Sequence, residues 1–372
     1  MSDRPLRLAY VGDPNSIHVR RWMTFFADEG HAVTLLEGFG AAIEPGLDER
    51  IAVERFTAGR SPIPGLGARR TGAALRATLA RVKPDVLHAH FVRRFGWQAS
   101  SAGFHPLVVS GWGSDVLVER LRTWRVRWRD RRALSAADLV TVTNAFMRDA
   151  IVANGAEASR VALVQHGVDT ARFRPGAGGE AFRSALGVGT APVVLSPRAI
   201  RPLYRHETVL AAFAAATDDA VLVMSALDAD PITLESVHQQ ARALRITDRV
   251  RIVDRIAADQ LPDAYRAAAA VVSVPESDSF PVTLQEAMAS GVPLVVGDLP
   301  PTRAILGPLL PEALVPIGDV EATAARLRHA LGLDPGARER VGSILRGWAV
   351  READYMTNMR RMETLYRGLV GR

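Results

Sequence analysis

Short apolar runs alternate along the whole chain with longer amphipathic stretches. In the first half the runs that we expect to form strands are 6–11, 32–36, 85–88, 106–110, 139–142 and 161–164. In the second half they are 193–195, 221–224, 250–253, 271–274 and 294–296. Continuous apolar runs separated by helical patterns are typical of parallel sheets with helices on both faces. The pattern therefore predicts an α/β protein with two Rossmann-like, doubly wound parallel sheets.

The helical pattern is clearest near the two ends of the chain. A helix is expected over 17–30, with Trp22, Phe25 and Phe26 on one face, and further helices over 320–331 and 338–369. The glycine-rich stretch 175–179 is the best candidate for a linker. We therefore expect one domain over 1–172 and a second over 173–350, facing each other across a cleft. Ligands of such sheets bind beyond the carboxyl ends of the strands.

The most informative segment, 277–293, indicates a loop, a short helix and a stop before the strand at 294–296. Asp278 and Glu286 stand eight residues apart across the start of this helix, Pro281 precedes its first turn, and Gly291 and Pro293 end it. A helix N-terminus offers unpaired N–H groups to a phosphate. A carboxylate one turn further in suits a neutral hydroxylated group such as a ribose. The spacing therefore suggests a sugar nucleotide lying across the helix start.

The composition limits the chemistry that this site can use. The chain has 372 residues, 48% of them hydrophobic and 23% charged, and it contains no cysteine. It shows no apolar run long enough to span a bilayer and no basic-then-apolar leader at Met1, so we expect a cytoplasmic protein. Of the 46 basic residues only Lys83 is a lysine. Any phosphate contact must therefore come from arginine, backbone N–H or hydroxyl groups, unless Lys83 is placed for it.

The segment 277–293 resembles the donor-site signature of glycosyltransferase family 4, Glu-x7-Glu followed by Ala-Met-Ala-x-Gly-x-Pro. Glu286 and residues 287–293 match this signature, whereas Asp278 stands in place of the first Glu. The resemblance implies a GT-B fold, a retaining reaction without metal or cofactor, and a last helix, over 351–372, that packs back on the first domain. It also implies that Glu286 holds the ribose and that Asp278 contacts the donor sugar. The implied seat of the diphosphate comprises Ser279, Phe280, Pro281, Val282 and Thr283.

Three arginines follow the first strand of the second half. The family usually places an Arg there and a Lys five residues later, both on the donor diphosphate. Arg198 matches the first, but Leu203 occupies the place of the Lys. Either Arg201 or Arg205 substitutes for it, or the charge is missing. A solvated loop is the alternative interpretation of all three.

The loops of the first half supply the candidates for the acceptor side. Gly12 ends the first strand and, by the resemblance, faces the donor diphosphate and the acceptor. Trp112 stands where many members of the family carry a His, within a Trp-Gly-Ser-Asp loop that a subset of the family shares. Asp115 orients a sugar hydroxyl or acts only as a helix cap. His88 and His90 end the preceding strand, where His90 is a candidate catalytic residue and a structural role is the alternative for both.

The segment 165–173 resembles the Asn-Gly-Val-Asp-x-x-x-Phe segment at the domain junction of the family.

The densest basic run, 120–132, has a different character because it carries Trp124 and Trp128 on one helix face. Such a helix can lie on an anionic membrane surface, which would suit a lipid-linked acceptor, or line an acidic acceptor cleft. A solvated helix in an arginine-rich protein is the plainer alternative.

The sequence thus predicts a retaining glycosyltransferase that moves a sugar from a UDP-, GDP- or dTDP-sugar to a hydroxyl acceptor, with peripheral contact to the inner membrane face left open. A non-catalytic relative that binds sugar nucleotides is the first alternative, because Asp278, Trp112 and the absent lysine depart from the family pattern. A sugar-nucleotide epimerase or a phosphorylase is the second, although Lys83 is poorly placed to carry pyridoxal. No basic-aromatic module typical of nucleic-acid binding is present.

Overall fold

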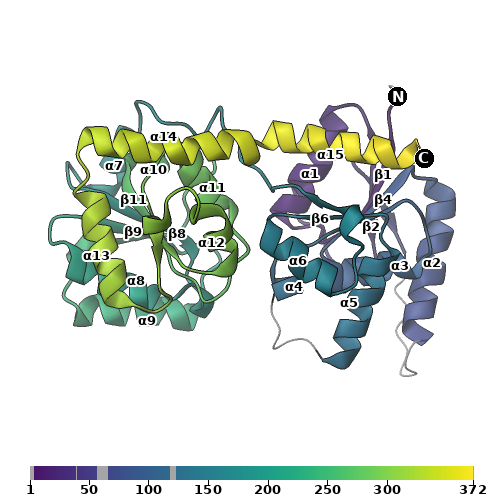
Figure 1. Ribbon diagram of the computed structural model, residues 1–372, viewed down its shortest axis with the longest axis horizontal. Helices are drawn as coiled ribbons and strands as arrows, with labels where there is room; N and C mark the ends of the chain where they lie inside the picture. The colour runs from purple at the N-terminus through teal and green to yellow at the C-terminus, as the bar shows by residue number, and fades with distance from the viewer. Residues whose placement is uncertain (1–3, 39, 57–65, 118–122, 372) are drawn as a thin grey trace. The chain divides into compact units, whose positions relative to one another are not determined.

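The computed structural model describes residues 4–38, 40–56, 66–117 and 123–371 (Figure 1). The chain divides into two compact units. The first comprises residues 1–166 together with 357–372, and the second comprises 167–356. The sequence placed these divisions after 172 and after 350.

The first unit is built on a seven-stranded sheet in the order β3-β2-β1-β4-β5-β6-β7, in which every neighbouring pair is parallel. Its strands are β1 (Arg7–Val11), β2 (Ala32–Glu37), β3 (Ala52–Arg55), β4 (Val86–His90), β5 (Leu107–Ser110), β6 (Leu139–Val142) and β7 (Val161–Leu163). Its helices are α1 (Ile17–Asp28), α2 (Leu66–Val82), the π-helix η1 (Val92–Gly96), α3 (Trp97–Ser101), α4 (Ser114–Leu117), α5 (Trp124–Ala136), α6 (Ala145–Ala153), the 3-10 turn η3 (Ala158–Arg160) and most of α15 (Tyr355–Val370).

The second unit is built on a six-stranded parallel sheet in the order β10-β9-β8-β11-β12-β13. Its strands are β8 (Val193–Ala199), β9 (Val221–Ser225), β10 (Val250–Val253), β11 (Ala268–Ser273), β12 (Leu294–Gly297) and β13 (Leu314–Val315). Its helices are α7 (Glu180–Leu186), α8 (His206–Ala216), α9 (Pro231–Ala243), α10 (Leu261–Ala267), α11 (Val282–Ala289), α12 (Pro300–Leu306), α13 (Val320–Leu331) and α14 (Pro335–Glu352), with 3-10 turns η4 (Pro202–Tyr204), η5 (Thr247–Arg249) and η6 (Pro311–Ala313).

Helices cover both faces of the second sheet. One apolar core lies between the sheet and α8, α9 and α13, and the other lies between the sheet and α7, α10, α11 and α14 (Figure 1). Central strands buried on both faces need apolar side chains at every position, which explains the continuous apolar runs in the sequence. In each sheet the strand order reverses at one place, between β1 and β4 and between β8 and β11. Ligands of doubly wound sheets bind at such switch points, outside the carboxyl ends of the strands.

Two strands were missed because they lack the apolar run that marks the others. β3 (Ala52–Arg55) lies at the edge of the first sheet and is largely exposed, with a polar half, and β13 (Leu314–Val315) is only two residues long. The helix predicted over 338–369 is in fact two helices, α14 and α15. Between them Asp354 accepts a hydrogen bond from the Thr170 hydroxyl at 2.7 Å, and the Tyr355 N–H donates to the Val168 carbonyl at 3.0 Å.

The predicted linker at 175–179 is wrong, because the units divide at 166 and this stretch belongs to the second unit, where its last two glycines pack against α10. A Cβ on Gly178 would lie 2.9 Å from Asp263 Oδ1, and one on Gly179 would lie 2.8 Å from the backbone N of Ala267. Both glycines also have positive φ, +130° and +93°. The glycines therefore allow the chain to approach α10 closely rather than to move freely.

The last helix contributes to the core of the first unit. Tyr366 is fully buried, and its hydroxyl lies 3.2 Å from the Tyr10 hydroxyl and 2.5 Å from His88 Nδ1. Its ring also packs against Phe26, with centroids 5.2 Å apart. These contacts join the end of the chain to the two central strands β1 and β4.

Candidate active site

The candidate donor site lies in the second unit, where the loops after β8 and β11 meet the start of α11. Pro281 is the N-cap residue of α11, and Gly291, with a φ of +69°, follows its end, as the sequence predicted. Phe280 adopts a positive φ of +84° and is 1% exposed, with its ring against Trp348 at 5.4 Å. A bulky residue in this conformation is held there by its surroundings. The loop that leads into α11 is therefore fixed by packing.

Arg198 is held from several sides at this helix start. Its Nη2 lies 2.7 Å from Asp278 Oδ2, its Nη1 donates to the Thr283 hydroxyl at 3.2 Å, and its guanidinium carbon lies 4.3 Å from the centre of the Tyr204 ring. The Arg198 side chain is only 14% exposed. Its Nε is buried and has no hydrogen-bond partner among the described residues. A charged donor is thus preorganised at the N-terminus of α11.

Asp278 faces Arg198 with one oxygen and its own loop with the other. Oδ1 accepts a hydrogen bond from the Ser279 N–H at 2.7 Å, and the side chain is 12% exposed. Burial raises the pKa of Asp278 above its ordinary value, although the charge of Arg198 and the Ser279 N–H oppose the rise. The predicted contact of Asp278 with a donor sugar stays a prediction. The structure shows that the carboxylate pairs with Arg198.

Glu286 lies one turn further along α11 and is held by a residue that the sequence did not single out. The hydroxyl of Tyr265, on α10, lies 2.8 Å from Glu286 Oε2 and 3.0 Å from the Thr283 carbonyl oxygen. Tyr265 is fully buried, whereas Glu286 is partly exposed. Burial, together with the neighbouring Glu286, raises the pKa of Tyr265 well above its ordinary value. The phenol therefore remains a hydrogen-bond donor at any physiological pH.

Arg198 lies within β8, which is longer than the predicted strand, whereas Arg201 and Arg205 follow β8 and differ in their partners. Arg201 turns to the loop after β9, where its Nε donates to the Asp228 carbonyl at 2.9 Å and its Nη2 pairs with the Asp228 carboxylate. Arg205 pairs with Glu276 at 2.9 Å, and Glu276 precedes Asp278 in the loop after β11. Of the two, the structure joins Arg205 to the loop that carries Asp278 and Arg201 to a different loop.

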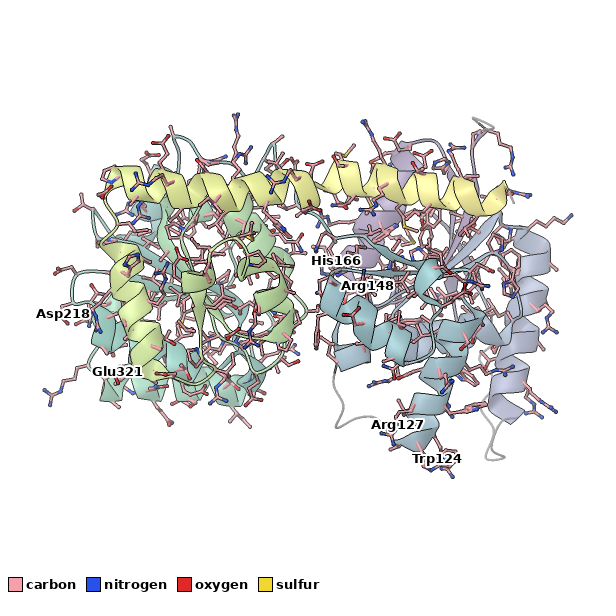
Figure 2. The ribbon with its side chains drawn as sticks, in the orientation of Figure 1. Trp124, Arg127, Arg148, His166, Asp218 and Glu321 are labelled. Atoms are coloured by element: carbon pink, nitrogen blue, oxygen red, sulfur yellow. The ribbon has the colours of Figure 1, made fainter. Side chains whose placement is uncertain are left out.

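In the first unit, aromatic rings and imidazoles gather at the carboxyl edge of the sheet. The His18 and His166 rings stack with centroids 4.8 Å apart, and the Trp112 ring lies 5.6 Å from His18, 5.4 Å from His166 and 5.2 Å from His90. His166, labelled in Figure 2, follows β7 along the chain. Gly12 is buried beside this cluster, and a Cβ there would lie 3.2 Å from Val19 and 3.5 Å from His90. The structure thus brings Gly12 and His90 together.

These imidazoles are kept neutral by burial. Burial, with a smaller effect of Arg21, lowers the pKa of His18 to about 4. Burial also lowers the pKa of His88 to about 3 and holds the pKa values of His90 and His166 well below their ordinary value. Neither ring nitrogen of His90 has a hydrogen-bond partner among the described residues. The group of rings around Trp112 is therefore aromatic and uncharged at neutral pH.

Asp115 is engaged by backbone groups. It is 1% exposed, its Oδ2 accepts from the Val92 N–H at 2.7 Å, and its Oδ1 accepts from Trp112 and Gly113 at 3.1 and 2.9 Å. The carboxylate therefore ties the loop after β4 to the loop after β5 and fixes the backbone of Trp112. His88 is likewise structural, since its Nε2 lies 2.7 Å from the Ser110 hydroxyl and its Nδ1 meets Tyr366.

Sequence reasoning missed Tyr204 and Tyr265 as parts of the donor site. Tyr204 lies between Arg201 and Arg205, where the arginines carry the only signal of phosphate binding. Tyr265 lies 21 residues before Glu286, on the helix before β11. No local signal marks such a residue, because its role depends on how α10 packs behind α11.

The described part of the basic run forms α5, and residues 120–122 lie outside the described residues. Trp124 and Trp128 are 69% and 55% exposed, with Arg125, Arg127 and Arg129 exposed beside them. Asp130, in contrast, is buried and lies 3.5 Å from Arg93 Nε. Figure 2 shows Trp124 and Arg127 at the end of α5 that points away from the sheet. The exposed side of the helix is therefore basic and aromatic.

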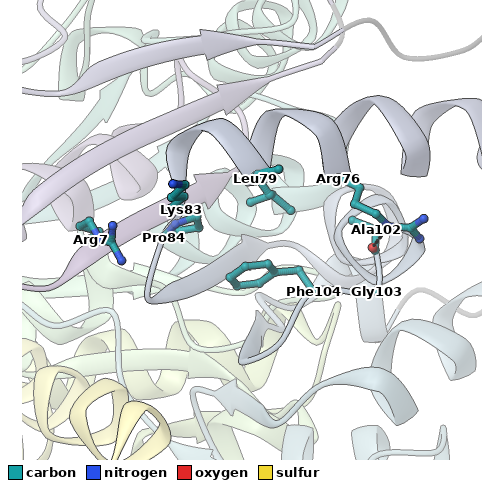
Figure 3. A pocket seen from close by; sticks show the side chains of 9 residues that line it. Arg7, Arg76, Leu79, Lys83, Pro84, Ala102, Gly103 and Phe104 are labelled. Atoms are coloured by element: carbon teal, nitrogen blue, oxygen red, sulfur yellow. Dashed lines mark hydrogen bonds between the residues drawn. The ribbon is translucent and has the colours of Figure 1, made fainter.

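One hollow of about 410 Å³ in the first unit lies away from these loops (Figure 3). It is lined by Arg7, Arg76, Leu79, Ala80, Lys83, Pro84, Ala102, Gly103 and Phe104. These residues lie at the amino ends of β1, β4 and β5, opposite to the edge where ligands of parallel sheets bind. The only lysine of the chain thus lies far from the predicted phosphate seat in the sequence and belongs to the other unit.

Two further features concern the described residues, 4–38, 40–56, 66–117 and 123–371. No helix among them is long and apolar enough to cross a membrane. No cluster of three or more His, Asp or Glu side chains among them is arranged to hold a metal ion.

Known proteins resemble both units. The family model described as glycosyl transferase 4-like matches residues 7–144, and that described as glycosyl transferases group 1 matches residues 180–346. The D-inositol 3-phosphate glycosyltransferase of Actinosynnema mirum is 30% identical over 291 residues, which cover 70% of this chain and 69% of that protein. The corresponding enzyme of Streptomyces bingchenggensis is 30% identical over 225 residues, covering 58% of this chain and 49% of its own length.

Solved structures agree on the fold. HepE of Anabaena in complex with UDP and glucose superimposes with a TM-score of 0.81 at 18% identity, covering 98% of this chain and 100% of that chain. Sucrose-phosphate synthase of Thermosynechococcus elongatus gives 0.80 at 19% identity, with 98% and 99% covered. The two parallel sheets and these likenesses define the GT-B fold. The chain belongs to the glycosyl transferases group 1, the family 4 type, which confirms the family and fold predicted from the sequence.

Proposed function

We propose that this glycosyltransferase moves a sugar from a nucleoside diphosphate to a hydroxyl acceptor with retention of the anomeric configuration. The observation that carries the proposal is Arg198, a buried cation fixed at the N-terminus of α11 with an Nε–H that lacks a partner among the described residues. Buried donors are almost always paired, so this one suits an anionic ligand. HepE of Anabaena was solved with UDP and with UDP-glucose, which supports the choice of a nucleotide sugar.

In this proposal the charge of the leaving diphosphate is balanced by Arg198, by Arg205 and by the N-terminal N–H groups of α11, with no metal ion. Preorganised donors aimed at a developing anion usually supply the largest single part of the rate enhancement. Glu286 accepts hydrogen bonds from the ribose hydroxyls. Asp278 exchanges its ion pair with Arg198 for the hydroxyls of the donor sugar when the diphosphate arrives. Retention means that the acceptor oxygen joins the anomeric carbon from the face that the diphosphate leaves.

The acceptor is proposed to meet the edge of the first sheet. Trp112 with His18, His90 and His166 offers an uncharged surface of rings, which suits the apolar face of a sugar or polyol. The Trp-Gly-Ser-Asp loop thus replaces the usual His of the family with a stacking surface. Relatives are named for D-inositol 3-phosphate, and the polyol ring of such an acceptor, though not its anionic phosphate, is consistent with this uncharged surface.

Peripheral contact with an anionic membrane is the proposed role of α5. Exposed tryptophans settle at the membrane interface, and each arginine near an anionic surface adds about 1 kcal/mol of attraction. Co-sedimentation with vesicles of phosphatidylglycerol and phosphatidylcholine should therefore decrease when Trp124 and Trp128 are both replaced by serine. Equal binding of both proteins, or none by the wild type, would contradict this role and favour a solvated helix.

The proposed function is tested by a thermal-shift screen against UDP-, GDP- and dTDP-sugars, followed by transfer assays with the sugar nucleotide that binds. A ligand that binds only the folded state raises its apparent stability. A shift with one nucleotide class and turnover with retained configuration are expected. Binding without turnover would favour the non-catalytic alternative, interconversion of the free sugar nucleotide would favour an epimerase, and no shift with any ligand would refute the donor site.

A further inference from the structure

Tyr265, on α10, contacts two residues of the candidate donor site, Glu286 and Thr283 of α11. It lies on α10, is 0% exposed, and packs edge-to-face against Phe173 with ring centroids 5.8 Å apart. Its hydroxyl is the only polar atom of a side chain that is otherwise surrounded by the core between the sheet, α10 and α11. That hydroxyl approaches two atoms, Glu286 Oε2 and the Thr283 carbonyl oxygen.

Both of these partners lead directly to groups that the proposed function uses. Glu286 is the carboxylate assigned to the ribose. Thr283 belongs to the first turn of α11, and its hydroxyl accepts from Arg198 Nη1 at 3.2 Å. A carboxylate on a partly exposed helix turn has several rotamers of similar energy unless a neighbour selects one. A buried phenol that donates to one of its oxygens selects the rotamer, and the hydrogen bond is charge-assisted.

We propose that Tyr265 is a positioning residue that fixes the Glu286 carboxylate for the ribose hydroxyls and so makes the site selective for ribonucleotides. The proposal rests on the proposed function, because it takes the nucleotide at Glu286 as given. Tyr265 does not touch the ligand. It acts through the orientation of Glu286.

The test compares Tyr265→Phe with the wild type by calorimetric titration. UDP and GDP are titrated first, and the nucleotide that binds more tightly is then compared with its 2′,3′-dideoxy form. Phenylalanine keeps the ring and its packing but removes the hydrogen bond to Glu286. A charge-assisted hydrogen bond corresponds to about tenfold or more in an equilibrium constant. We expect Tyr265→Phe to weaken binding of the ribonucleotide about tenfold and binding of the dideoxy form less than about twofold.

Tyr366→Phe is the matched control. Tyr366 is also a fully buried tyrosine with a hydrogen-bonded hydroxyl, but it belongs to the first unit and contacts His88 and Tyr10. The Tyr366→Phe variant should have a lower melting temperature but an unchanged affinity for either nucleotide. Glu286→Asp provides a second route if Tyr265→Phe does not fold, because aspartate keeps the charge but draws the carboxylate away from Tyr265. It should show the same selective loss for the ribonucleotide.

The outcomes separate this inference from the proposed function. If the wild type binds a ribonucleotide and Tyr265→Phe weakens both forms equally, Tyr265 is a core residue only and the inference is wrong while the donor site stands. The same holds if Glu286→Asp discriminates ribose as well as the wild type does. If the wild type binds neither UDP nor GDP, the inference is overturned, and the proposed function is overturned with it only if dTDP-sugars do not bind either.

Discussion

The two sheets share one topology, but the side chains at their switch points differ in charge. At the edge of the second sheet charged groups are paired at short distance, Arg198 with Asp278 and Arg205 with Glu276. At the edge of the first sheet the titratable side chains that surround Trp112 are imidazoles that burial holds neutral. The same backbone architecture thus supports one charged site and one uncharged aromatic site.

The difference follows from the side chains that each edge uses. An arginine keeps its charge on burial because its intrinsic pKa is very high, so it can bind a diphosphate in a protected site. A histidine loses its charge under the same conditions, since desolvation penalises the protonated form. A surface made of neutral histidines and Trp112 therefore offers little attraction to an anion. It suits a neutral, hydroxylated molecule, and the predictions below test this division.

The largest effect is expected from removing the buried cation of the charged edge. Arg198→Ala should lower the rate of sugar transfer by about 10²- to 10³-fold, the usual result of deleting one preorganised donor to a developing anion. Arg201→Ala, three residues away, should change the rate less than about threefold, because that arginine pairs with Asp228. Steady-state kinetics with the nucleotide sugar measure both. Similar losses for the two variants would show that Arg201 shares the diphosphate.

A smaller effect, on nucleotide affinity, is expected to distinguish Glu286, on α11, from Asp278, in the loop before it. Glu286→Ala should weaken nucleoside diphosphate binding about tenfold or more, because it removes the acceptor of the ribose. Asp278→Ala should change the same constant less than about threefold, because the loss of the carboxylate leaves Arg198 in place for the diphosphate. Thermal shift and calorimetry with UDP or GDP compare the two. Equal and negligible effects would contradict both roles.

The neutral imidazoles at the edge of the first sheet should make the free energy of unfolding depend on pH. The pKa of His18 is lowered to about 4 and that of His88 to about 3, so the unfolded chain binds more protons than the folded one below pH 6.5. Stability is therefore complete above pH 6.5 and falls as the pH decreases towards those lowered values. Each of these two histidines should lower the free energy of unfolding at pH 5 by on the order of 1–2 kcal/mol, relative to neutral pH.

Melting temperatures measured between pH 7.5 and 5 test this expectation. The melting temperature of the wild type should fall over this range, and that of His18→Gln should fall less. A melting temperature independent of pH in the wild type would show that these imidazoles are not held neutral. A fall of equal size in His18→Gln would place the sensitivity at other groups.

The smallest effect is expected from metal removal. Because the proposed site balances the diphosphate with arginine and backbone N–H groups, excess EDTA should change the transfer rate less than about twofold. The assay is run on protein purified without added divalent ions, with magnesium restored in a parallel sample. A loss that magnesium reverses would mean that the charged edge of the second sheet is incomplete without a cation.

Much of the secondary structure of this protein can be predicted from local patterns in its sequence. Apolar runs of strand length predicted nearly all the central strands, and failed at β3 and β13, which are partly polar or very short. The donor helix was predictable because Pro281, Gly291 and the spacing of Asp278 and Glu286 act within a few residues of one another. Arg198 was identified from its place after the first strand of the second half. Each of these features depends on short-range stereochemistry.

Only the tertiary structure decided how these residues are paired. Arg198 meets Asp278 across 80 positions of sequence, and Tyr265 reaches Glu286 only because α10 packs behind α11. The different partners of Arg201 and Arg205, and the meeting of Trp112 with His18 and His166, likewise depend on which loops lie side by side. The sequence by itself determined the elements and the ends of the strands, because those depend on neighbouring residues. Contacts, burial and protonation depend on residues that are distant in the chain, and only folding brings these together.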